Sequence, residues 1–119
     1  METSKLPVYN AARELYLQIH RSTQKVPRSV RYGKVAEVEG LVLSLMEAIA
    51  FANDAREVRE RLQFIDKSKD MLRRVVVMVR CIRDLGFLRS KSFSAIIRYE
   101  DSLARQLSGW ERKTLSDAR

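Results

Sequence analysis

Apolar residues recur at steps of three and four along most of the chain, a spacing that places them on one face of an α-helix. The strictest run lies in the first half of the sequence and consists of Val35, Val38, Val42, Leu45, Ile49 and Ala52. Only four glycines and two prolines interrupt the 119 residues. β-Branched residues do not alternate as they do in half-buried strands. The sequence therefore predicts an all-α protein.

Four helices are expected, over residues 7–25, 30–53, 55–85 and 91–112. The connections between them are short, so neighbouring helices should run antiparallel. The predicted architecture is an up-down-up-down four-helix bundle that forms a single domain over residues 1–119.

The predicted helix ends follow from local residue preferences. Pro27 ends the first helix, because proline cannot continue one. Ser29 is the expected N-cap of the second helix, and Ser90 or Ser92 that of the fourth. Gly86 suits the position just after the third helix, where a left-handed conformation is common.

The chain is strongly basic, with 23 Lys and Arg against 15 Asp and Glu and a formal charge of +8. Such a balance favours a polyanionic partner, with nucleic acid ahead of an anionic membrane surface. The apolar runs are too short to cross a bilayer, and the N-terminus has no apolar core of an export signal. A cytoplasmic protein without a membrane partner is expected. The single cysteine, Cys81, lies in an apolar run and is expected in the core.

A basic cluster surrounds Pro27, since no acidic residue lies between Leu15 and Ala36. Its members are Arg21, Lys25, Arg28, Arg31 and Lys34. We interpret them as contacts to phosphate groups, with ordinary loop solubility as the alternative. Tyr32 lies within the cluster and either stacks on a base or packs under the loop.

Two further basic rows lie on the later helices. On the third helix, Lys69, Arg73 and Arg80 fall within about 40° of one another at ~100° per residue. On the fourth, basic residues recur at intervals of seven and share one face, namely Lys91, Arg98, Arg105 and Arg112. Either row alone is compatible with a solvated helix flank. Three basic features in one small domain favour nucleic-acid binding, because affinity grows with the number of phosphates neutralised.

No catalytic residue, metal ligand or cofactor site is predicted. His20 is the only histidine and is expected at a surface or an interface. The chain has neither a Gly-rich phosphate loop nor Cys/His metal spacing. The adjacent carboxylates Glu100 and Asp101 are explained by a polar helix face. An enzyme is therefore not expected.

Several segments, in this order and spacing, resemble the accessory variability determinant proteins of diversity-generating retroelements. They are "LPVY", "VPRSVRY", "AND", "LRRVVVMVRCIRDLGFL" and "LARQLSGWERK", and the resemblance covers about Leu6 to Lys113. The most specific parts are Pro27-Arg28-Ser29 followed by Arg31, then Arg80 ahead of Asp84-Leu85-Gly86, then Gly109-Trp110. The same fold is shared with proteins encoded in intervening sequences of large-subunit ribosomal RNA genes.

The resemblance implies a four-helix bundle that assembles into a homopentameric ring. Such a protein would bind the element's reverse transcriptase and contact template RNA or cDNA through a basic surface, without catalytic activity of its own. Arg28, Arg31, Arg80 and Trp110 match the family pattern, and Trp110 is expected to be buried in the bundle or at a subunit contact. The alternatives are a structural oligomer of the ribosomal intervening-sequence group, or a toxin–antitoxin-like interaction module whose charge only maintains solubility.

Overall fold

The computed structural model describes residues 1–118, and every element in this range is helical. The elements are a short 3-10 turn Thr3–Lys5, α1 Pro7–Ser22, α2 Arg28–Val30, a π-helical turn Arg31–Val35, α3 Ala36–Asp54, α4 Val58–Asp84 and α5 Ser90–Asp117. α2, the π-helical turn and α3 follow one another without a break. In the described range no helix is both long and apolar enough to cross a membrane.

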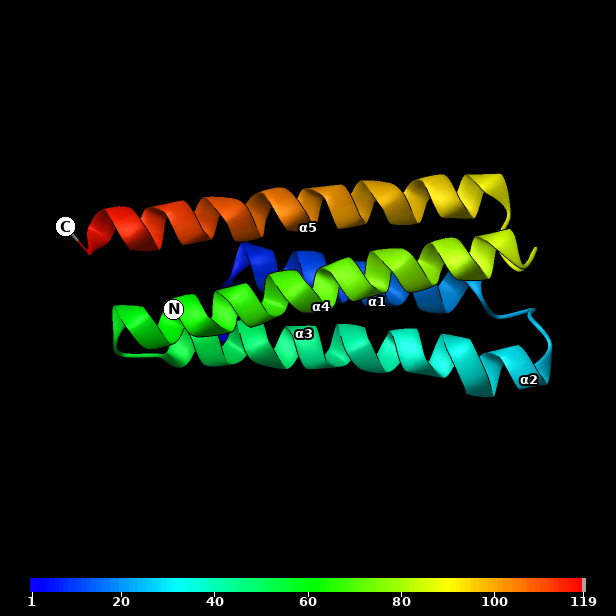
Figure 1. Ribbon diagram of the computed structural model, residues 1–119, viewed down its shortest axis with the longest axis horizontal. Helices are drawn as coiled ribbons and strands as arrows, with labels where there is room; N and C mark the ends of the chain where they lie inside the picture. The colour runs from blue at the N-terminus through cyan, green and yellow to red at the C-terminus, as the bar shows by residue number, and fades with distance from the viewer. Residues whose placement is uncertain (119) are drawn as a thin grey trace.

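The four long helical segments form a rod of about 50 × 22 × 22 Å. α1 packs against α3 and α5, and α4 closes the ring by packing against the same two helices. Successive segments run in opposite directions (Figure 1). The predicted all-α four-helix bundle is confirmed. The α1–α2 and α4–α5 connections therefore lie at the same end of the rod, which we call the basic end for reasons given below.

The core is built by the predicted apolar stripes. The stripe from Val35 to Ala52 is at most 1% exposed at each of its six positions. The other helices contribute Val8, Ala12, Leu15 and Ile19 from α1, Leu72, Val75, Val79 and Ile82 from α4, and Phe93, Ile96, Leu103 and Leu107 from α5. Burial of these side chains supplies the main stabilisation of the bundle.

Helix α1 ends at Ser22, three residues earlier than predicted. Thr23 explains this, because its Oγ1 donates to the carbonyl of Ile19 at 2.8 Å and its N–H bonds His20. The side chain of Gln24 also donates to the His20 carbonyl, at 2.7 Å. These bonds satisfy the last carbonyls of α1 without another helical turn.

The predicted serine caps are wrong. Pro27 and Arg89 hold the N-cap positions of α2 and α5, and neither helix start receives a side-chain hydrogen bond. Pro27 takes an extended conformation with φ −55° and ψ 150°, so the helix begins directly after it, at Arg28. Ser29 therefore lies inside the first turn and does not precede it.

The predicted role of Gly86 is confirmed. Its φ of +89° lies in the left-handed region. The N–H of Phe87 bonds the carbonyl of Ile82 at 3.1 Å, and the N–H of Gly86 bonds that of Arg83 at 2.8 Å. This pair of bonds is a Schellman motif, which turns the chain sharply from α4 toward α5.

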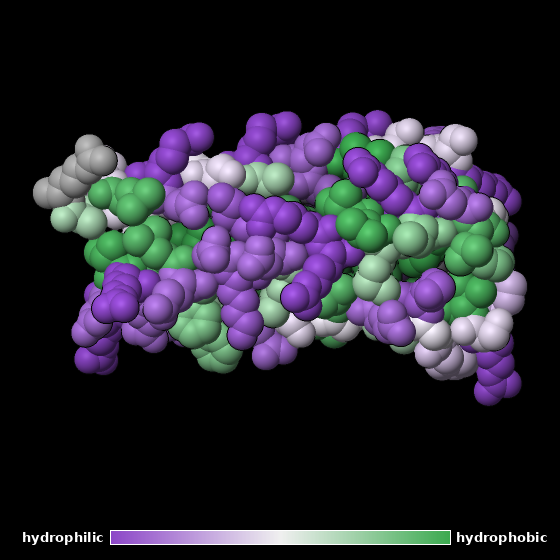
Figure 2. Space-filling model, in the orientation of Figure 1, coloured by the Kyte–Doolittle hydropathy of each residue, from purple (hydrophilic) through white to green (hydrophobic). Residues whose placement is uncertain are grey.

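Cys81 is exposed, so its predicted place in the core is wrong. It lies between Val77 and Leu85 at four-residue steps, and these neighbours are 60% and 55% exposed. The three residues form an outer stripe on α4, opposite the core stripe of that helix. Hydrophobic residues gather on this face toward the basic end (Figure 2).

Candidate nucleic-acid interface

The basic cluster gathers at the basic end of the rod. Arg21 lies in the last turn of α1, Lys25 in the connection, Arg28 at the start of α2, and Arg31 and Lys34 in the π-helical turn. Four of the five side chains are exposed, and Arg31 is half-buried. The short connection thus concentrates these charges within a few helical turns.

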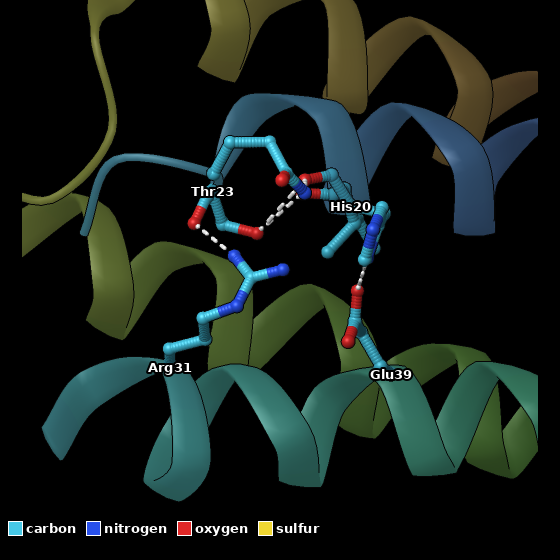
Figure 3. A network of polar contacts seen from close by, with 6 residues as sticks. His20, Thr23, Arg31 and Glu39 are labelled. Atoms are coloured by element: carbon cyan, nitrogen blue, oxygen red, sulfur yellow. Dashed lines mark hydrogen bonds and ion pairs between the residues drawn. The ribbon is translucent and has the colours of Figure 1, made fainter. Parts of the chain in front are cut away.

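Arg31 has a structural contact. Its Nη1 donates to the carbonyl oxygen of Thr23 at 3.0 Å (Figure 3). Thr23 is buried, with 1% of its surface exposed. Arg31 therefore holds the end of α1 against the π-helical turn, which leaves Arg28 and Lys34 as the more accessible cations of this segment.

A second contact braces the same region. Nδ1 of His20 on α1 lies 2.8 Å from Oε2 of Glu39 on α3 (Figure 3). The imidazole also stacks on the ring of Tyr16, with 6.2 Å between centroids. His20 is thus a contact between two helices.

Tyr32 is 70% exposed, so it does not pack under the loop. The Arg28 guanidinium carbon lies 5.6 Å from the centroid of its ring, within the range of a cation–π contact. An exposed ring beside cations provides a platform on which a base can stack.

A concave pocket of about 540 Å³ lies between the two connections at the basic end. Arg21 and Lys25 line it from the first connection, and Arg89 from the second. Within residues 1–118 these three cations form no ion pair. We call this the end pocket. Arg89 was not among the predicted site residues, although its position after the Gly86 turn places it at the same end as Pro27 in any antiparallel bundle.

The predicted row on α4 is largely neutralised. Lys69 Nζ lies 3.1 Å from Glu111 Oε1 on α5, and Arg73 pairs with Asp70 one turn earlier on the same helix. Arg80 is exposed and forms no ion pair with a described residue. For Lys69 and Arg73 the structure therefore agrees with a solvated, ion-paired flank.

The row on α5 has a different environment. Its four side chains are exposed and none is paired with a carboxylate in the described part of the chain: Lys91, Arg98, Arg105 and Arg112. At ~1.5 Å per residue the row is about 30 Å long. It starts beside the end pocket, because Lys91 follows Arg89 by two residues. The end pocket and this row are the two parts of the candidate basic surface.

Glu100 was expected on a polar helix face, and this is wrong. It is 5% exposed, and its Oε2 is buried without a hydrogen-bond partner in the described residues. Burial raises its pKa to about 7, an effect that nearby Arg80 reduces and Asp101 increases. A shallow groove of about 350 Å³ between α4 and α5 lies beside it. Within residues 1–118, Glu100 is a buried carboxylate that forms no ion pair.

A family model for 23S rRNA-intervening sequence proteins matches residues 4–109. The chain belongs to this family. The sequence resembles two related groups, and the match confirms the broader one, the proteins encoded in intervening sequences of ribosomal RNA genes. The matched range of this 23S rRNA-intervening sequence protein contains both connections of the basic end and most of α5. No curated protein matches the chain.

Proposed function

We propose that this 23S rRNA-intervening sequence protein binds nucleic acid, in the cytoplasm and without catalysing a reaction. The observation that carries the proposal is the basic surface formed by the end pocket and the α5 row. Its cations are exposed and lack carboxylate partners among residues 1–118. Unneutralised Lys and Arg side chains bind phosphates by releasing condensed counterions.

Binding through such a surface should be sensitive to salt and tolerant of sequence. Cations spaced by whole helical turns reach phosphate oxygens, whereas base edges are read by side chains placed inside a groove. The rod ends in a pocket and has an exposed aromatic ring nearby, Tyr32, which favours unpaired strands over a regular duplex.

The finer proposal is an accessory protein of a diversity-generating retroelement. It rests on the motif around Pro27 and on Gly109-Trp110, whose order resembles that family. In this role the protein forms a homopentameric ring, binds the reverse transcriptase of the element, and holds template RNA or cDNA on its basic surface. The ring repeats one weak phosphate site by symmetry, which raises its avidity.

The second candidate is a structural oligomer of the ribosomal intervening-sequence group without a retroelement role. The family match favours it, because that match names this group alone. A reverse transcriptase gene with template and variable repeats beside the coding sequence supports the retroelement role. Capture of that polymerase by the tagged protein is the direct test, and failure of the two co-expressed proteins to associate contradicts it.

Nucleic-acid binding is tested by titrating a single-stranded RNA at several salt concentrations between 50 and 200 mM, a range over which phosphate contacts lose strength steeply. The variant replaces three row residues: Arg98→Gln, Arg105→Gln and Arg112→Gln. Its matched control makes the same charge change outside the row, with Arg56→Gln, Arg59→Gln and Lys67→Gln in the α3–α4 connection and the first half of α4.

The row variant should bind more weakly and show a salt slope smaller by about 2 to 3, as expected for three lost phosphate contacts. The control should keep its slope within about 1 of the unmodified protein. No binding at low salt, or equal losses in the two variants, contradicts the proposal.

A further inference from the structure

The end pocket joins two parts of the chain that are far apart in sequence. Arg21, Lys25 and Val26 come from the α1–α2 connection, and Phe87, Leu88 and Arg89 from the α4–α5 connection. The Gly86 turn positions the second group, since its Schellman bonds fold Phe87 and Leu88 back onto the bundle. The pocket is therefore a fixed feature of the fold at this end of the rod.

The electrostatics of the end pocket favour an anion. Three cations line it, and no acidic residue does so in the described part of the chain. Like charges held around one concavity repel one another, and a bound anion removes this repulsion. A terminal phosphomonoester carries a charge of about −1.5 to −2 at pH 7, against −1 for an internal phosphodiester, and so matches a cluster of three cations better.

Part of the lining of the end pocket is apolar. Val26, Phe87 and Leu88 contribute it, and all three also pack on the hydrophobic core. A site for a bare phosphate does not need apolar lining. A nucleotide does, because its base presents an apolar face that stacks on aromatic side chains such as Phe87.

The size of the end pocket fits one nucleotide. Its volume of about 540 Å³ falls within the range of small-ligand sites, roughly 300 to 1,000 Å³. Lys91, in the first turn of α5, is the row residue nearest in sequence to the pocket residues Arg89 and Ser92, so a strand that leaves the pocket along α5 can next contact the α5 row.

From these observations we propose that the end pocket binds the terminal, phosphorylated nucleotide of a single strand, with the adjoining nucleotides along α5. Arg21, Lys25 and Arg89 hold the terminal phosphate, and Phe87 receives the base. The inference rests on the proposed nucleic-acid binding and adds a preference for strand ends. No covalent step is involved.

The test compares four forms of one short RNA at low salt: a linear strand with a terminal phosphate, the same strand after phosphatase treatment, a covalently closed circle, and a blunt duplex. A mononucleotide and inorganic phosphate are tested separately as competitors. Strands phosphorylated at the 5′ and at the 3′ end are compared, and the fluorescent label sits at an internal position so that both ends stay available.

The phosphorylated linear strand should bind at least about fivefold more tightly than the dephosphorylated strand, the circle or the duplex. Arg89→Gln should abolish this advantage, because it removes one of the three pocket cations. Phe87→Leu should weaken the linear strand while keeping apolar packing. The control Arg56→Gln removes one exposed cation near the opposite end and should leave the advantage unchanged.

Equal binding of the linear strand and the circle overturns the inference, as does an equal effect of Arg89→Gln and Arg56→Gln. In either case salt-sensitive binding to all four RNAs leaves the proposed function intact. A mononucleotide that competes as well as the strand assigns the pocket to free nucleotides and overturns the strand-end assignment. No binding of any RNA at low salt contradicts both the inference and the proposed function.

Discussion

His20 and Glu39 join α1 to α3 through a contact of 2.8 Å between Nδ1 and Oε2. Together with the bond from Arg31 to the Thr23 carbonyl, this contact fixes both sides of the connection that carries Lys25. These two contacts hold the segment that carries the cations of the basic end. Substituting a cation that makes such a contact should lower stability, whereas substituting an exposed cation should weaken binding.

Arg31 and Arg28 should differ in this respect. Arg31→Met leaves the carbonyl of buried Thr23 without its side-chain partner, which should lower the free energy of unfolding by about 1 to 2 kcal/mol. Arg28→Met removes an exposed cation and should change it by less than about 0.5 kcal/mol while weakening RNA binding. Urea unfolding and RNA titration of both variants check this, and equal stabilities would show that the Thr23 contact contributes nothing.

Glu100 should make stability depend on pH. Its pKa rises from the ordinary 4.5 to about 7 in the fold. A raised carboxyl pKa means that the folded state holds the proton more tightly, so stability is highest below the unfolded pKa and falls as pH rises through 7. Glu100→Gln should therefore raise the free energy of unfolding at pH 8 by about 1 to 3 kcal/mol and change it little at pH 4.5.

Urea unfolding between pH 4.5 and 8 measures the effect of Glu100. Asp101→Asn is the matched control, because it makes the same chemical change at the adjacent, exposed position. A pH dependence that survives in Glu100→Gln would assign it to other groups.

Gly86 should resist substitution. Alanine at its φ of +89° is strained, and Gly86→Ala should cost about 1 to 2 kcal/mol of folding free energy. Gly86→Asn should cost less, because asparagine tolerates this region. Gly40→Ala, inside α3 with open space around the added methyl group, should instead stabilise by about 0.5 to 1 kcal/mol. Thermal unfolding that shows the same sign for both alanine variants would contradict this account.

Trp110 packs against the core while remaining partly exposed. The expectation of burial in the bundle is therefore met in part. Trp110→Ala should cost about 2 to 3 kcal/mol through lost packing, and Trp110→Phe should cost less. If the exposed part of the indole is also a subunit contact, the molecular mass of Trp110→Ala in solution will fall at concentrations where Trp110→Phe stays assembled.

The apolar periodicity predicted the fold well, because apolar residues at steps of three and four lie on one face of a helix, and that face must pack against the other helices. It failed at Cys81 and Glu100, since the end of α4 is apolar on several faces and a carboxylate in a helix ordinarily points outward. The exposure of Cys81 and the burial of Glu100 depend on which helices lie next to them, and the pattern within one helix does not contain that information. Arg89 is a different case, because the predicted Gly86 turn and antiparallel helices already place it at the basic end, and only the pocket formed by the two connections required the structure.

The two basic rows on α4 and α5 show how far the candidate interface could be predicted from the sequence. Both rows have helical spacing in the sequence, but Lys69 finds Glu111 across the bundle, 42 residues later in the chain. Arg98 and Arg105 have no such neighbour within residues 1–118. The sequence of one helix does not show which acidic residues of a neighbouring helix lie beside it. A basic row that is paired with carboxylates therefore could not be distinguished from an unpaired one.

The π-helical turn Arg31–Val35 sets the phase between the cations and the core. It carries one residue more per turn than an α-helix, and each residue of an α-helix advances by about 100°. Deleting Gly33 would let the segment close into a regular α-helix with Val35 and Val38 still in the core. Arg28 and Arg31 would then swing by about 100° around the helix axis, and Arg31 would lose the Thr23 carbonyl. The length of this short segment, more than its composition, therefore determines the direction in which Arg28 and Arg31 project from the bundle. Deletion or insertion of a single codon is enough to change that direction while the hydrophobic stripe is preserved.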